Sequence, residues 1–166
     1  ERNRVRTVYI CSPYRAADSA QLDRNIDYAQ ALTKQAIEAG LAPITPHLYM
    51  TQCLNEDKPE ERAAGMAAGL TLLKRCDFVI VGVKYGISEG MSAEIAAADA
   101  AGIEVVNADK LRYKLEHDRR AWLEEYAKLH ACEFCRGSRL HTCTSYRCQQ
   151  PYREAYKYAE AHFTSG

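Results

Sequence analysis

The sequence has no long hydrophobic run and no excess of charge of either sign. No apolar stretch approaches the roughly 20 residues that a transmembrane helix needs, and the basic start at residues 1–6 leads into a strand-like segment rather than a signal-peptide core. We therefore predict a cytoplasmic protein with no membrane partner. The 22 basic and 22 acidic residues give zero net charge, so no overall field favours nucleic acid, and a small-molecule partner is expected instead.

The composition is that of an ordinary globular protein. Hydrophobic residues make up 47% of the 166 residues and charged residues 27%, which excludes a disordered or collagen-like chain. Seven cysteines are an odd number. Cys11, Cys53 and Cys76 occur singly in apolar or loop contexts, and we expect them to be reduced thiols. The length suits one domain with an appendage.

Strand-like and helix-like segments alternate through the first two thirds of the chain. The predicted strands are residues 7–11, 41–45, 77–83 and 103–106, and the helices between them are 18–39, one that Pro59 opens, and an alanine-rich one that follows the loop 84–90. A polar loop fills residues 46–58. This order predicts an α/β fold, a Rossmann- or flavodoxin-like parallel sheet with helices on both faces. Residues 1–107 form this predicted domain, and residues 108–166 form a helical, cysteine-rich extension.

Ligands of such sheets bind beyond the carboxyl ends of the strands. Residues 12–15 (SPYR) follow the first strand, His47 follows the second, and residues 88–94 (SEGMSAE) follow the third. Ser88 is placed to cap the next helix, whose free amides and positive dipole end favour a phosphate or a sugar hydroxyl. Gly90 leaves space beside these amides.

Glu94 lies one helical turn after Gly90, on the same face of the helix. Because helical side chains lean toward the N-terminus, its carboxylate is predicted to point into the gap above Gly90, where a sugar fits. The alternative is a solvent-facing glutamate that only complements the helix dipole. Ala93 and residues 96–98, all alanine, favour a helix that packs closely on the sheet.

Four segments together resemble the nucleoside 2-deoxyribosyltransferase superfamily, which includes the deoxynucleoside 5′-monophosphate N-glycosidases. These segments are residues 8–11 with Arg15, residues 45–47, residues 76–81, and the motif Ser88-x-Gly90-x-x-x-Glu94. Their order, spacing and places at strand ends agree with the family throughout. The resemblance implies an enzyme that cleaves the N-glycosidic bond of a nucleoside or a (deoxy)nucleoside 5′-monophosphate, as a hydrolase or as a deoxyribosyltransferase. It also implies a homo-oligomer.

The resemblance implies a role for two groups in the chemistry, and no cofactor for catalysis. Glu94 would attack C1′ of the sugar and form a glycosyl-enzyme intermediate, which passes to water or to another base. Tyr9 would donate a hydrogen bond that orients this carboxylate. The alternative for Tyr9 is a tyrosine that only fills the core.

The other matched residues would bind the substrate. Arg15, with Ser88 and the helix amides above Gly90, would hold a 5′-phosphate, because a guanidinium matches phosphate oxygens bidentately. Ser12 belongs to the same loop, and His47 would meet the base or the phosphate. Arg15 and His47 also suit simple loop residues, and these alternatives stay open.

One position departs from the family pattern. Many relatives carry an aspartate on the second helix, eight residues before the aspartate that is Asp77 here, and use it to protonate the leaving base. This chain has Gly69 at that position. A substrate with a better leaving group, or a nucleotide-sensing module without catalysis, would not need the acid. Otherwise a water or another acid supplies the proton, and the candidates are Asp57, Glu60 and Glu61.

The extension carries a cysteine cluster between two predicted helices, residues 109–130 and 151–162. Four thiolates this close fit a tetrahedral structural Zn²⁺ site without an open position for catalysis. Free thiols are the alternative, and His130 or His141 would be substitute ligands. The predicted ligands are Cys132, Cys135, Cys143 and Cys148. In a sensor, the extension would contact a protein or a nucleic acid.

Overall fold

The computed structural model describes residues 4–131 and 149–163. Its centre is a four-stranded sheet in the order β2-β1-β3-β4, and every neighbouring pair of strands is parallel. The strands are β1 (Thr7–Cys11), β2 (Ala42–Ile44), β3 (Phe78–Val81) and β4 (Glu104–Asn107). The chain order reverses between β1 and β3, so the open crevice of this sheet lies above these two strands.

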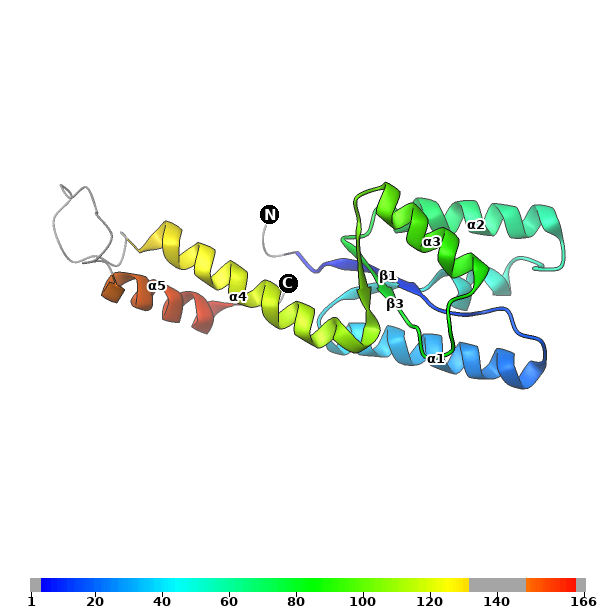
Figure 1. The fold of residues 1–166 in the computed structure, drawn as a ribbon, viewed down its shortest axis with the longest axis horizontal. Coiled ribbons are helices and arrows are strands. Elements are labelled where there is room, and N and C mark those ends of the chain that lie inside the picture. The colour runs from blue at the N-terminus through cyan, green and yellow to red at the C-terminus, as the bar shows by residue number, and fades with distance from the viewer. Residues whose placement is uncertain (1–3, 132–148, 164–166) are drawn as a thin grey trace. The chain divides into compact units, whose positions relative to one another are not determined.

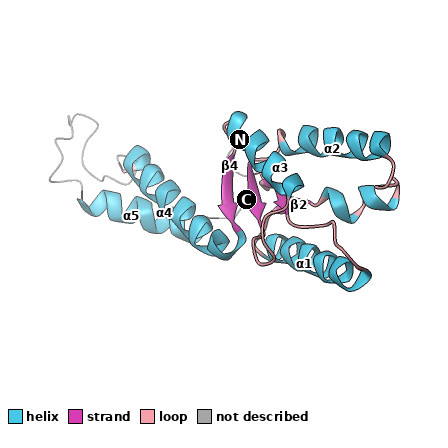
Figure 2. Ribbon diagram, turned by 45° about the vertical axis from the view of Figure 1, so that its right-hand side comes forward, coloured by secondary structure: helices cyan, strands magenta, loops and turns pink. Residues whose placement is uncertain are grey.

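Helices cover both faces of the sheet, which confirms the predicted α/β class. Helix α1 (Ser19–Glu38) lies on one side of the strands, and α2 (Pro59–Leu73) and α3 (Glu89–Ala100) lie on the other (Figure 1 and Figure 2). Helices α4 (Leu111–His130) and α5 (Gln149–His162) follow the last strand, as the sequence predicts.

The helix boundaries follow from local chemistry. The side chain of Asp18 caps α1 by accepting a hydrogen bond of 2.8 Å from the Gln21 amide, and Gly40 ends the helix region with a φ of 77°. Pro59 opens α2, where a missing N–H costs nothing. Ser88 caps α3 and accepts from the Met91 amide at 3.3 Å. Each cap confirms a boundary predicted from sequence.

Several predicted segments differ in detail, and the second and fourth strands differ from their predicted bounds by one residue at each end. The loop predicted over residues 46–58 contains two 3₁₀ turns, η1 (Pro46–Leu48) and η2 (Met50–Gln52), because Pro46 is preorganised for a helical turn. The third strand is shorter than predicted and begins after Asp77. This carboxylate accepts from the Thr7 amide at 2.7 Å and pairs with Arg4, so it joins the amino ends of β1 and β3. Asp77 therefore has a structural role.

The two faces of β1 pack against different helices, because successive side chains of a strand point to opposite sides. Tyr9 and Cys11 belong to the buried cluster beneath α2 and α3, while Val8 and Ile10 point to the face covered by α1. The other buried members of the first cluster are Leu73, Cys76, Val79, Val81, Met91 and Ala98. Burial on both faces fixes the register of β1 and therefore the direction of Tyr9.

The described residues form two compact units that divide between Arg112 and Tyr113. In the second unit small residues of α4 and α5 are buried, among them Ala127 and Ala155, and the rings of Trp122 and Phe163 lie 5.1 Å apart.

The four predicted zinc ligands lie outside the described residues. No helix in residues 4–131 and 149–163 has both the length and the apolar character that crossing a bilayer requires.

Candidate functional site

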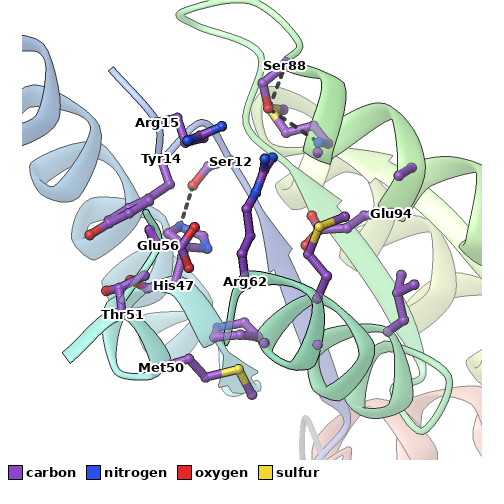
Figure 3. A pocket seen from close by; sticks show the side chains of 18 of the residues that line it. Ser12, Tyr14, Arg15, His47, Met50, Thr51, Glu56, Arg62, Ser88 and Glu94 are labelled. Carbon is purple, nitrogen blue, oxygen red and sulfur yellow. Dashed lines mark hydrogen bonds between the residues drawn. The ribbon is translucent and has the colours of Figure 1, made fainter. Parts of the chain in front are cut away.

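A cavity of about 300 Å³ opens in the α/β unit, above the carboxyl end of β1. Its lining comes from β1 and the loop after it, the two 3₁₀ turns, α2, and the start of α3 (Figure 3). All seven residues that the sequence predicts for catalysis or substrate binding line this one cavity: Tyr9, Ser12, Arg15, His47, Ser88, Gly90 and Glu94. The volume suits a small molecule held by a few polar groups.

Tyr9 and Glu94 form a hydrogen-bonded pair at the wall of the cavity. The Tyr9 hydroxyl donates to Glu94 Oε1 at 2.7 Å. The Tyr9 side chain is 1% exposed, while Glu94 is half-buried and lines the cavity. Tyr9 therefore fills the core and orients the carboxylate at once, and Glu94 is not a freely solvated surface glutamate.

Burial controls the protonation of this pair. Burial raises the pKa of Glu94, and the hydrogen bond from Tyr9 opposes that rise by stabilising the carboxylate, as the neighbouring Cys11 thiol also does. The pKa of Tyr9 is raised by burial and by the neighbouring charge of Glu94, so its phenol keeps its proton. Glu94 is thus a partly desolvated carboxylate with a fixed donor, which is the state of a nucleophile or a base.

Ser12 and His47 form a second polar pair in the cavity. The Ser12 hydroxyl and His47 Nε2 are 3.0 Å apart, and Ser12 is buried. Burial lowers the pKa of His47 to about 4, so the imidazole is neutral at neutral pH. The Tyr14 ring lies 6.0 Å from the imidazole, tilted by 53°. This pair offers neutral donors and acceptors to a ligand rather than a charge.

The start of α3 borders the cavity. Ser88 and Gly90 both line the cavity there, and Arg15 enters from the loop after β1. A Cβ added at Gly90 would find no atom closer than Ser88 Oγ at 3.9 Å. Packing therefore does not require glycine at this position, and its missing side chain leaves room inside the cavity.

One side of the cavity was not foreseen from the sequence. Glu56 precedes α2, Arg62 comes from its first turns, and both side chains point into the cavity (Figure 3). Met50, Thr51, Met66 and Leu70 complete this side. Met50 and Thr51 belong to η2, whereas Met66 and Leu70 lie four and eight residues after Arg62 on α2. Only the folded position of α2 reveals them.

The proton donors considered from the sequence do not reach the cavity. Asp57, Glu60 and Glu61 are absent from its lining. Glu61 accepts hydrogen bonds from the Asn55 amide at 2.7 Å and from Lys58 Nζ at 2.9 Å. The described acidic residues that line the cavity are Glu56, Glu89 and Glu94.

Comparisons with known proteins place the α/β unit in a family. A search of curated proteins finds no match. One similar solved structure is a 2-deoxyribosyltransferase from the psychrotolerant bacterium Bacillus psychrosaccharolyticus, with 19% sequence identity and a TM-score of 0.46, over 61% of this chain and 70% of that chain. Residues 6–108 match a domain of unknown function, DUF7768. This match spans the whole sheet with its covering helices, and the protein therefore belongs to the DUF7768 family.

Proposed function

We propose that this protein breaks the N-glycosidic bond of a nucleoside or a (deoxy)nucleoside 5′-monophosphate, with Glu94 as the nucleophile. The observation that carries the proposal is the 2.7 Å hydrogen bond between Tyr9 and Glu94 in the wall of a nucleoside-sized cavity. The resemblance of four sequence segments to the nucleoside 2-deoxyribosyltransferase superfamily supports the same chemistry.

The reaction has two displacements. A carboxylate oxygen of Glu94 forms a bond to C1′ while the bond from C1′ to the base nitrogen breaks, and its electron pair leaves with the base. Water then attacks C1′ of the glycosyl-enzyme, releases the free sugar or sugar phosphate, and restores the carboxylate. A second base in place of water would give a transferase. Tyr9 holds the attacking oxygen in one orientation, so the nucleophile is preorganised and less entropy is lost on reaching the geometry of attack.

The departing base needs a proton, and Glu56 is our proposed donor. It points into the cavity, half-buried, from the segment before α2 (Figure 3). Asp57, Glu60 and Glu61 do not line the cavity. A carboxylic acid beside the base would protonate the leaving nitrogen in the first step and deprotonate water in the second.

A phosphate on the substrate fits the cationic end of the cavity. The side chains of Arg15, Arg62 and Ser88 lie at this end, beside the start of α3 (Figure 3). Guanidinium groups and a helix N-terminus both favour phosphate oxygens. We therefore propose a 5′-monophosphate as the better substrate, and hydrolysis as the better outcome, because a free nucleoside would leave these groups unused.

The test is release of free base from a panel of ribo- and deoxyribonucleosides and their 5′-monophosphates, followed by chromatography. We expect the wild-type protein to release one base and Glu94→Gln to lose at least about 10³-fold in kcat, as removal of a nucleophile does. Glu89→Gln is the matched control, because Glu89 lines the same cavity from the same helix but is exposed. A silent wild-type protein, or equal activity of Glu94→Gln, would contradict the proposal. Adding a second base separates a transferase from a hydrolase.

A nucleotide sensor is the second candidate, and Gly69 favours it because the usual acid of the resembling enzymes is missing there. A sensor would bind a nucleotide in the same cavity and release no base. Calorimetric binding without turnover, unchanged in Glu56→Gln, would favour this function over catalysis.

A further inference from the structure

Gly69 lies on the buried face of α2, opposite the hydroxyl of Tyr9. It is one of two buried residues of this helix, and it lines the cavity. A Cβ added at position 69 would stand 3.1 Å from Tyr9 Oη. Carbon and oxygen atoms that are not bonded rarely approach so closely, so either the helix or the hydroxyl would have to move.

The backbone does not explain this glycine. Gly69 is inside a regular helix, and the described glycines with positive φ are Gly40, Gly86 and Gly102. Alanine suits a helix interior better than glycine, and α2 has alanine at positions 63, 64, 67 and 68. Space, rather than conformation, is what position 69 requires.

The Tyr9 hydroxyl has little freedom to give way. Its ring is 1% exposed and packs in the buried cluster with Leu73 and Val79. The hydroxyl is also held at 2.7 Å from Glu94 Oε1. A shift of a few tenths of an ångström would lengthen or tilt this hydrogen bond. Gly65 differs, because a Cβ there would meet only the flexible end of Leu54, at 3.0 Å.

We propose that Gly69 is a positioning residue for Glu94 and acts through Tyr9. Its missing side chain makes the space in which the Tyr9 hydroxyl reaches the carboxylate. Any side chain at position 69 would press on the Tyr9 hydroxyl through its Cβ. Glycine itself carries no acid, so under the proposed function the proton for the leaving base comes from elsewhere in the cavity. The catalytic part of this inference rests on the proposed function, whereas the steric part does not.

The test is a double-mutant cycle on positions 69 and 9. We expect Gly69→Ala to lower kcat about 10-fold with KM little changed, since a small misplacement of a reacting group is costly. In a Tyr9→Phe background the hydroxyl is gone, and Gly69→Ala is expected to cost no further activity. Ala68→Gly, a change at an exposed neighbour outside the cavity, controls for the altered helix propensity.

A second measurement separates this inference from the proposed function. Carboxyl ¹³C NMR follows the titration of Glu94 in each variant without any substrate. Gly69→Ala should raise the pKa of Glu94 when Tyr9 is present and leave it unchanged in Tyr9→Phe, because only the first background has a hydrogen bond to lose. If the wild-type protein releases no base, the proposed function is wrong. The titration of Glu94 would still show whether Gly69 positions Tyr9.

The inference fails if Gly69→Ala changes the titration of Glu94 equally in both backgrounds, or in neither. If Gly69→Ala alone fails to fold while the double variant folds, the steric exclusion is supported. If both fail to fold, Gly69 serves helix packing in general, and the positioning role is overturned.

Discussion

Two walls of the cavity differ in how they are built. The first, which we call the sheet wall, consists of Tyr9, Ser12, Ser88, Gly90 and Glu94, from the end of β1 and the start of α3. The second, the helix wall, consists of the lining residues between Pro46 and Leu70. The sheet wall rests on parallel strands buried on both faces, whereas the helix wall has two 3₁₀ turns and a partly exposed helix.

This difference separates two tasks. A reacting carboxylate must be held in one geometry, which the buried Tyr9 and the capped start of α3 provide. Substrate choice tolerates a more adaptable surface, and the helix wall supplies the proposed proton donor and one of two cavity arginines. Changes in the sheet wall should therefore alter the chemical step, and most changes in the helix wall should alter which substrate is accepted.

Glu56→Gln lies in the helix wall but should alter the chemical step, and so it is an exception to this division of tasks. We expect kcat to fall by about 10²-fold, because the leaving base loses its general acid. The loss should shrink for a substrate analogue whose leaving group needs no proton, such as a nitrophenyl deoxyriboside. Asp57→Asn, next to it in sequence and outside the cavity, is the matched control. Equal losses with both kinds of leaving group would exclude Glu56 as the donor.

Tyr9→Phe should expose the dependence of the sheet wall on one hydrogen bond. We expect a loss of about 10-fold in kcat/KM, with the phenyl ring keeping the core packed. Burial raises the pKa of Glu94 and the Tyr9 hydroxyl opposes that rise, so removing the hydroxyl raises the pKa further. The acid limb of the pH–rate profile should move to higher pH. A profile that stays in place would show that Tyr9 does not act on Glu94.

Arg62→Ala should sharpen the contrast by affecting binding alone. We expect KM for a 5′-monophosphate to rise by about 10-fold, with kcat and the KM for the matching free nucleoside unchanged. Arg75→Ala, a change at an arginine outside the cavity, is the control. Steady-state kinetics on both substrates gives the answer. An equal rise in KM for the nucleoside and the monophosphate would show that Arg62 does not bind the phosphate.

His47→Gln should have the smallest effect, on stability rather than on chemistry. Burial lowers the pKa of His47 to about 4, below its usual value of about 6.5. Between these two pH values the unfolded chain binds the proton more readily than the folded chain. The contribution of neutral His47 to the free energy of unfolding is therefore complete above pH about 6.5 and is lost as the pH falls toward about 4. Urea unfolding from pH 8 to pH 4 should show a shallower decline in His47→Gln. Parallel curves would contradict the burial of a neutral imidazole.

The sequence predicts the two walls unequally. Strand ends, caps and helical spacing point to Ser12, Ser88 and Glu94, because short-range periodicity indicates where each side chain points. Tyr9 was singled out only by the family resemblance. Glu56 carries no such signal. Its place in the cavity depends on the two 3₁₀ turns and on the packing of α2 against the sheet, which are long-range features.

The sequence by itself determined the alternation of strands and helices, the cap at Ser88, and the spacing that aims Glu94 at the end of the sheet. Residue patterns alone did not pair Tyr9 with Glu94; the family resemblance suggested the pair, the tertiary structure shows the hydrogen bond, and only the tertiary structure shows that Gly69 leaves room for it. The reason is physical. Hydrophobic periodicity is encoded within a few residues, whereas a contact between residues 85 positions apart exists only once strands and helices have packed together.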